Sequence, residues 1–212
     1  MAEKINKGIF IVLDGPDGCG KSTQSRRLKE DLVSRGHEVV LTQEPGGTDL
    51  GGMIRDVILK KENIKLERIT ELFLFETDRA QHVGEIIKPA LEDGKTVICD
   101  RFNAATFAYQ GYALGMDIGL IKELDSAATG GLEPDLTLIL DVDIKTGLER
   151  AGHVGQADRM EKRGFDFHEK VRQGFLDIAK NSPDKFRVIE VQEDMDHTHR
   201  LVKEAVLGVL EK

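Results

Sequence analysis

The sequence predicts an α/β fold in which helices cover both faces of a five-stranded parallel sheet, giving three layers. The first observation is a set of five short apolar runs, at residues 9–13, 38–41, 95–100, 136–141 and 186–191. Their nearly continuous apolar character is typical of strands that are buried on both faces. The second observation is that segments with helical spacing of apolar residues separate these runs, as crossover helices do. A glycine-rich loop directly after the first run is the third.

Helices are expected between the strands and after the last one. A first helix over residues 21–35 should end at Gly36, which can adopt the left-handed conformation of a helix C-terminus. A second helix is expected over residues 50–59. Thr70 is predicted to cap a long helix that reaches residue 91, where Pro89 kinks or restarts it. Further helical segments are predicted at residues 104–109, 118–129, 145–151, 165–180 and 199–210.

Length and composition favour one domain over residues 1–212. With 212 residues and 40% hydrophobic content, the chain can bury one sizeable core. The glycine- and charge-rich piece at about 152–164 interrupts the helical pattern and is expected to form a small mobile lid. A net charge of −8 argues against nucleic acid or an anionic membrane surface as the partner. No apolar run approaches the roughly 18 residues of a membrane span, and we expect a cytoplasmic protein with two reduced cysteines.

Residues 15–22 have the spacing G-x4-G-K-[ST] of a phosphate-binding loop, or P-loop. A buried strand precedes the loop and an amphipathic helix follows it, which is the context that the motif requires. Glycines allow backbone N–H groups to surround phosphate oxygens, and the helix N-terminus adds a partial positive charge. Lys21 is expected to reach the β- and γ-phosphates, and Ser22 to offer its hydroxyl to Mg²⁺. The fold class is therefore that of the P-loop NTPases.

A P-loop alone leaves a GTPase, a mechanical ATPase or a small-molecule kinase open. A GTPase would need the guanine-reading pattern N-K-x-D, but Asn6-Lys7 precedes the first strand and lacks the aspartate. A motor ATPase usually needs more chain for mechanical coupling. Several features instead point to a second, phosphate-bearing substrate that faces the nucleoside triphosphate.

Two of these features come from the third strand and the long helix. Asp100 ends the third strand, where an acidic residue can hold the Mg²⁺ shell, and Arg101 can reach a phosphate from the loop. An Asp–Arg surface ion pair is the structural alternative. Phe75 and Arg79 share one face of the long helix, where an aromatic ring and a cation could bind a nucleobase. Core packing is the alternative role of Phe75.

Taken together, these motifs resemble those of the thymidylate kinase family, whose members phosphorylate dTMP to dTDP with ATP. The matching stretches are the P-loop with its strand at 10–24, E-P-G-G-T at 44–48, F-E-T-D-R-A-Q-H at 75–82, D-R-F leading into A-Y-Q-G at 100–111, and D-R-M-E at 158–161. They follow the family's order and extend over most of the chain, from residue 9 to about 179. The resemblance implies in-line transfer of the γ-phosphoryl group to an acceptor oxygen that is already anionic, with Mg²⁺ as cofactor.

The resemblance also implies which residues bind the acceptor dTMP. Phe75 would stack on thymine, and Arg79 would donate to its O4. Thr106 and Gln110 would read the pyrimidine edge. Tyr109 would lie under the sugar, where its bulk disfavours a ribose 2′-OH, and Asp17 would bind the 3′-OH. Arg55 and Arg101 would clamp the monophosphate, while Glu44 would order the loop between the phosphates. The implied acceptor set is Asp17, Glu44, Arg55, Phe75, Arg79, Arg101, Thr106, Tyr109 and Gln110.

The implied donor set consists of the P-loop and one arginine beyond it: Gly15, Pro16, Asp17, Gly18, Cys19, Gly20, Lys21, Ser22, Thr23 and Arg150. Ser22 and Asp100 are the expected metal ligands. Some family members carry a catalytic arginine in the P-loop and others in the lid before the D-R-x-E motif, but both places lack one here. Of the remaining candidates Arg150, Arg159 and Arg163, we expect Arg159 to act in catalysis with Lys21, Asp100 and Arg101, and Arg150 to be next.

Two other functions stay open on the residues alone. The chain could phosphorylate another pyrimidine monophosphate, namely dUMP, UMP or CMP, or it could be a non-catalytic nucleotide-binding switch. Phe75, Arg79, Tyr109 and Gln110 argue against the first, and the missing lid arginine is the only feature that favours the second. Family members generally pair through helices beside the sheet, so the resemblance also implies a homodimer.

Overall fold

The computed structural model describes residues 8–61, 63–152 and 159–210. Five parallel strands form one sheet in the order β2-β3-β1-β4-β5. Their bounds are β1 Ile9–Asp14, β2 Val39–Gln43, β3 Thr96–Asp100, β4 Leu136–Asp141 and β5 Phe186–Glu190. Val12 lies opposite Cys99 on one side and Thr137 on the other. The predicted five-stranded parallel sheet is confirmed.

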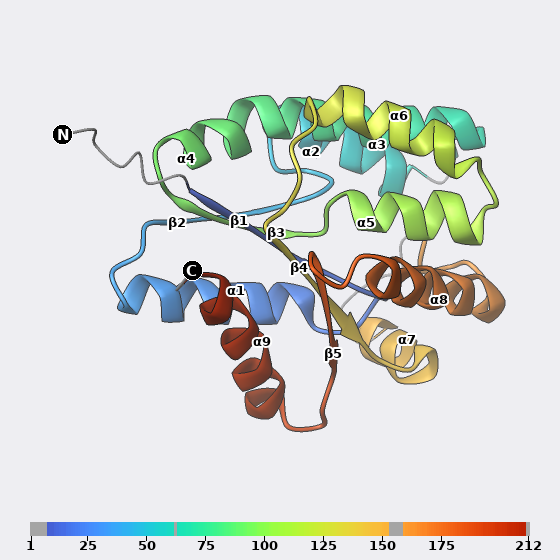
Figure 1. Ribbon diagram of the computed structural model, residues 1–212. Helices are drawn as coiled ribbons and strands as arrows, with labels where there is room; N and C mark the ends of the chain where they lie inside the picture. Colours follow the sequence, from blue (N-terminus) through green and yellow to red (C-terminus); the bar gives the residue numbers. More distant parts are fainter. Residues whose placement is uncertain (1–7, 62, 153–158, 211–212) are drawn as a thin grey trace.

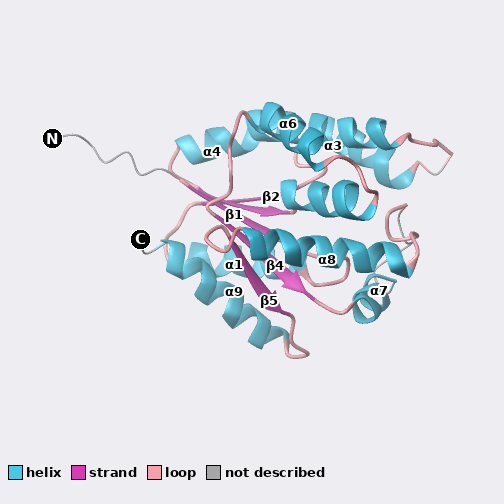
Figure 2. Cartoon of the chain, turned by 45° about the vertical axis from the view of Figure 1, so that its right-hand side comes forward, coloured by secondary structure: helices cyan, strands magenta, loops and turns pink. Residues whose placement is uncertain are grey.

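Helices cover both faces of the sheet (Figures 1 and 2). The face with α1 (Lys21–Ser34) and α9 (Met195–Leu210) buries the side chains of Ile11, Leu13, Leu138 and Leu140 against Leu28 and Val202. Because side chains alternate along a strand, Phe10 and Val12 point to the other face, where they pack on η2 (Val83–Ile87) and α4 (Lys88–Glu92). Ile139 points the same way and packs on η3 (Phe107–Ala113) and α8 (Phe165–Asn181). The core is thus two layers of side chains separated by the sheet.

The helical elements have these bounds: α1 Lys21–Ser34, α2 Asp49–Arg55, η1 Asp56–Lys60, α3 Arg68–His82, η2 Val83–Ile87, α4 Lys88–Glu92, α5 Asn103–Thr106, η3 Phe107–Ala113, α6 Ile118–Thr129, α7 Ile144–Gly152, α8 Phe165–Asn181 and α9 Met195–Leu210. Those labelled η are π-helical turns that continue a neighbouring α-helix. Gly36 has a φ of +90° just after α1, as expected for a residue that ends a helix. No helix among the described residues is long and apolar enough to cross a membrane.

Two predicted helix starts differ from those in the structure. The long helix begins at Arg68 with Glu67 as its N-cap residue, so Thr70 lies inside the helix and does not cap it. The predicted restart at Pro89 is confirmed, because Pro89 lies in the first turn of α4 and the wide turn of η2 precedes it. This arrangement suits proline, which has no N–H to donate to the preceding turn. The last helix begins at Met195, one turn before the predicted residue 199.

Of the predicted lid at about 152–164, residues 153–158 lie outside the described residues. Arg159 and the residues after it lead into α8, which lies beside η3 and α7. The carboxyl ends of β1, β2, β3 and β4 all open toward one edge of the sheet. In parallel sheets this is the edge where ligands bind. The loops that follow these strands carry most of the predicted site residues.

Candidate active site

A cavity of about 470 Å³ opens at the carboxyl ends of the strands. It brings together residues from the P-loop, from the loop after β2, from α3 and from α5 with η3. Of the predicted site residues, those that line it are Asp17, Gly18, Gly20, Lys21, Ser22, Thr23, Glu44, Arg55, Phe75, Arg79, Asp100, Arg101, Thr106, Tyr109, Gln110 and Arg150. The sheet therefore gathers residues that are up to 133 positions apart in the sequence, Asp17 and Arg150, into one space, as the topology predicted.

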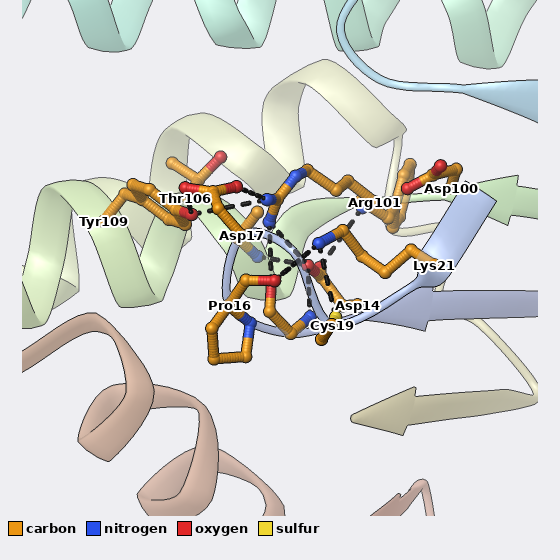
Figure 3. Close-up of polar contacts among 12 residues, drawn as sticks. Asp14, Pro16, Asp17, Cys19, Lys21, Asp100, Arg101, Thr106 and Tyr109 are labelled. Atoms are coloured by element: carbon orange, nitrogen blue, oxygen red, sulfur yellow. Dashed lines mark hydrogen bonds and ion pairs between the residues drawn. The ribbon is translucent and has the colours of Figure 1, made fainter. Parts of the chain in front are cut away.

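The P-loop packs tightly against α7 and against the side chain of its own Lys21. Gly18 has a φ of +72°, and a Cβ there would lie 1.9 Å from the carbonyl oxygen of Gly147 in α7, so no larger residue fits. Lys21 turns back over the loop and donates to the carbonyl oxygens of Gly15 at 3.1 Å and Pro16 at 2.8 Å (Figure 3). Lys21 as a whole residue is 8% exposed. The loop thus holds one cation above a ring of backbone groups at the start of α1.

Ser22 and Asp100 meet at the floor of the cavity. The Ser22 hydroxyl donates to Oδ2 of Asp100 at 2.5 Å, although 78 residues separate them. Both supply hard oxygen ligands of the kind that Mg²⁺ prefers. The described residues contain no cluster of three or more side chains of the His, Cys, Asp or Glu type that could hold a metal. Mg²⁺ in a phosphate site takes most of its ligands from water and phosphate, so one hydroxyl and one carboxylate from the protein suffice. The residues present therefore fit the ion.

Arg101 lies between the P-loop and η3 and contacts both. Its backbone has a φ of +70°, which is uncommon for a residue with a side chain. Its guanidinium donates to the Gly15 carbonyl oxygen at 3.0 Å, to Asp17, and to the Tyr109 hydroxyl at 3.3 Å. It also lies 5.3 Å from the centre of the Tyr109 ring. Arg101 thus ties the donor loop to the helix that carries Tyr109.

Asp17 and Tyr109 form a short polar pair within this contact. The Tyr109 hydroxyl donates to Oδ2 of Asp17 at 2.8 Å. Burial alone would raise the pKa of Asp17, but the charges of Arg101 and Lys21 outweigh it and lower the pKa below its ordinary value. Burial raises the pKa of Tyr109 well above its usual range. The pair therefore presents a carboxylate and a neutral phenol to the cavity at pH 7.

Arg79, on α3, lines another part of the cavity. Its side chain is 2% exposed, and its donors reach three groups: Glu44 at 3.0 Å, Glu76 at 2.7 Å and the Thr106 hydroxyl at 3.0 Å. Asp125 lies 3.5 Å away. Burial acts to lower the pKa of Arg79, but the surrounding carboxylates outweigh it and raise the pKa above its ordinary value. Phe75 lies on the same helix and packs with Ile54, Ile58 and Met160 while lining the cavity.

The loop after β2 is held by a second set of buried groups. Glu44 also binds Nδ1 of His82 at 2.9 Å, and Nε2 of His82 lies 2.6 Å from the Thr42 hydroxyl. Asp78 accepts from the N–H of Gly46 at 2.9 Å, and burial together with the charge of Glu44 raises its pKa to about 6. Arg55 donates to the Pro45 carbonyl oxygen at 2.6 Å. The backbone of this loop is thus ordered by α2 and α3.

Glu71 joins Gln110 to the described part of the predicted lid, residues 159–164. Its carboxylate is 3% exposed and accepts from Gln110 at 3.0 Å, from Arg159 at 2.8 Å and from Arg163 at 3.3 Å. Arg159 is not among the residues that line the cavity, whereas Arg150 is. The guanidinium predicted to act in catalysis is therefore engaged by a carboxylate of α3. Its assignment to the transferred phosphoryl group is not supported by this geometry and stays a prediction.

A second hollow, of about 260 Å³, adjoins the cavity at the P-loop. It is lined by Gly18, Thr23 and Arg150, and by Gln192 and Thr198 from the loop after β5 and the start of α9. Arg150 lines both hollows. Cys19 is buried within the loop, 3.5 Å from the Lys21 ammonium.

Sequence reasoning placed His82 on the helix face of Phe75 and Arg79 but assigned no role to it, nor to Asp14, Glu71 or Asp78, although each bonds a predicted site residue or the backbone near one. Asp78 and His82 belong to the same motif as Phe75 and Arg79, and their spacing on one helix face was the signal available. Asp14 and Glu71 gave none, because their partners lie far away in the sequence.

Comparison with known proteins supports the resemblance seen in the sequence. The family model of thymidylate kinase matches residues 13–202. The thymidylate kinase of Deinococcus radiodurans is 43% identical over 202 residues, which cover 95% of this chain and 98% of that protein. That of Desulfosudis oleivorans is 47% identical over 189 residues, covering 86% and 88%.

Solved structures agree. The crystal structure of thymidylate kinase from Ehrlichia chaffeensis is similar with a TM-score of 0.78 and 36% identity, and the match covers 94% of this chain and 99% of that one. The shared fold is the three-layer arrangement predicted from the sequence. The chain belongs to the thymidylate kinase family.

Proposed function

We propose that this protein transfers the γ-phosphoryl group of ATP to dTMP, giving dTDP and ADP, as a step in dTTP synthesis. The observation that carries the proposal is the cavity itself, in which a P-loop faces a wall of Phe75, Arg79, Thr106 and Gln110. Family membership over nearly the whole chain supports the same reaction. A kinase needs this arrangement, because two anionic substrates have to meet in line within one shielded space.

On the donor side, the P-loop residues Gly15 to Thr23 would bind the ATP phosphates, with Lys21 as the point charge between them. Lys21 now bonds two loop carbonyl groups, and phosphate oxygens would replace these as its partners. Ser22 and Asp100 would hold Mg²⁺ directly or through water. When bound, the ion supplies charge that offsets the negative charge on the phosphates. The hollow lined by Arg150, Gln192 and Thr198 suits the base of the donor.

On the acceptor side, Phe75 would stack on thymine, while Arg79, Thr106 and Gln110 would read its polar edge. Arg79 is already held in place by Glu44, Glu76 and Thr106. Its guanidinium could therefore donate to the base without moving. Tyr109 and Asp17 would face the sugar, where the bulk of the Tyr109 ring would disfavour a ribose 2′-OH. Arg55 and Arg101 would bind the monophosphate. Glu44 would act on the loop through His82 and Arg79.

The transfer itself would require little proton chemistry, because the acceptor oxygen is already ionised. The protein's part would be to hold both phosphates in line and to compensate their charge with Lys21, Arg101 and a further arginine. The geometry favours Arg150 for that further role, since it lines the cavity beside the P-loop while Arg159 is paired with Glu71.

The working unit is proposed to be one domain that pairs as a homodimer in the cytoplasm, with the segment at about 152–164 as its lid. Support for pairing comes from exposed apolar side chains on two adjacent helices, Ile69 and Phe73 on α3 and Ile118 and Leu120 on α6.

Sedimentation equilibrium at micromolar concentration should give twice the mass of the chain. The parent monomer mass under those conditions would refute the dimer.

The proposed reaction is tested by ADP release over a panel of dTMP, dUMP, UMP and CMP with Mg-ATP. We expect the highest kcat/KM for dTMP, because the base wall and Tyr109 together select a deoxypyrimidine. Lys21→Ala is the control and should reduce turnover of dTMP on the order of 10³-fold or more, through loss of charge at the transferred group. Faster turnover of UMP or CMP than of dTMP, or no dTDP at all, would overturn the proposal.

Two arginine variants separate the roles of Arg150 and Arg159. Arg150→Ala should lower kcat roughly 10³-fold, as removal of an arginine at the transferring phosphoryl group does. Arg159→Ala should leave kcat within about fivefold and act mainly on the KM for dTMP, since Arg159 reaches the acceptor wall through Glu71 and Gln110. Initial rates at saturating and limiting dTMP give both constants. A larger loss of kcat in Arg159→Ala would instead assign the phosphoryl group to Arg159.

A further inference from the structure

Asp14, the last residue of β1, is fully buried and has no part in the reaction as described so far. Both of its carboxylate oxygens have partners. Oδ1 accepts from the N–H of Gly15 at 3.0 Å and from the Arg101 guanidinium at 3.3 Å. Oδ2 accepts from the N–H of Phe102 at 3.4 Å and from that of Ala105 at 3.1 Å. One carboxylate therefore contacts the P-loop and the region after β3 at once (Figure 3).

The contact with Ala105 has the geometry of a helix cap. The helical run formed by α5 and η3 starts at Asn103, and Phe102 in the N-cap position supplies no capping side chain. Ala105 is the third residue of the helix, and its N–H is one that a capping side chain normally accepts. Asp14, 91 residues earlier in the chain, supplies this side-chain acceptor at 3.1 Å, beside the Phe102 carbonyl oxygen at 3.2 Å from the same N–H. Its negative charge also interacts favourably with the partial positive charge of the helix N-terminus.

This helical run carries Thr106, Tyr109 and Gln110, all of which line the cavity. The other oxygen of Asp14 binds Gly15, the first residue of the P-loop, and Arg101, which itself bonds Asp17 and Tyr109. The start of the P-loop and the start of the helix at residues 103–113 thus both bind the carboxylate of Asp14.

Burial of this carboxylate is costly. Burial raises the pKa of Asp14 above its ordinary value, even though the charges of Arg101 and Lys21 act to lower it. An apolar residue of similar size would fill the same space without a desolvation cost. The carboxylate instead fixes orientation, because its four hydrogen bonds hold donors in the P-loop and in the segment after β3.

We propose that Asp14 is a positioning residue that sets the orientation of the acceptor helix, residues 103–113, relative to the P-loop. This inference rests on the proposed function, because that function assigns dTMP to the helix and ATP to the loop. Asp14 touches neither substrate in this assignment and acts through Arg101, Tyr109 and the helix backbone.

The test is Asp14→Asn, which keeps the size of the side chain and one acceptor oxygen. Its amide nitrogen must face either the N–H groups of Phe102 and Ala105 or those of Gly15 and Arg101, so one set of bonds is lost. We expect the Kd for dTMP, measured by calorimetry without ATP, to rise about tenfold or more. The Kd for Mg-ATP should change less than about threefold, and kcat should fall as well as kcat/KM for dTMP.

Asp135→Asn is the matched control. Asp135 accepts from the N–H of Phe10 at 2.8 Å and so binds the same strand near its opposite end, away from the cavity. This variant should leave both Kd values and kcat within about threefold. Equal weakening of dTMP and Mg-ATP binding in Asp14→Asn, or no change in either, would overturn the proposal.

A measurement on the parent protein covers the case in which Asp14→Asn does not fold. In NMR spectra recorded on acidification, the amide protons of Gly15 and Ala105 should shift together with one midpoint, because both bind the same carboxylate. Separate midpoints, or an Ala105 amide that does not shift, would contradict the inference. A parent that shows this shared titration but forms no dTDP would refute the proposed reaction alone.

Discussion

The pairing of Arg79 with buried carboxylates is the interaction on which the acceptor side of the site depends. Its guanidinium binds Glu44 from the loop after β2, Glu76 from its own helix and Thr106 from α5. A buried arginine that loses its partners is strongly destabilising, so the charge keeps these three elements in place. The wall that would receive the base is therefore built by the protein before any substrate arrives. Catalysis by positioning requires such a preformed wall.

Arg101 and Asp14 connect the P-loop with the helix at residues 103–113, the segments that would bind ATP and dTMP. Arg101 bonds Gly15 and Asp17 on the loop and Tyr109 on the helix, while Asp14 binds Arg101 and the backbone on both sides. Asp17 consequently belongs to the P-loop in sequence but pairs with the acceptor helix in space. In the proposed reaction the P-loop would therefore line the binding sites of both substrates, which fits a reaction between two phosphates held in line.

The sheet and most of the site were predictable, because their signals are local. Continuous apolar runs identify buried strands, and the P-loop spacing identifies its own strand and helix. Thr70 failed as a predicted cap because the helix could start one turn earlier, and side-chain preference alone does not decide between adjacent starts. Asp14 and Glu71 were not predictable, since their partners lie 91 and 88 residues away and only the fold brings them together. Arg159 matched a motif position, yet its partner Glu71 could not be known from that motif.

Hydrogen–deuterium exchange of single amides tests most directly whether the site is formed before substrate binds. The informative amides are those of Gly46, bound to Asp78, and Ala105, bound to Asp14, because neither lies within a sheet ladder. A preformed site predicts that both are protected in the free protein to the degree seen for amides of the central strand β1, with little change when dTMP is added. Exchange at nearly unprotected rates in the free protein, slowing only with dTMP, would contradict the account.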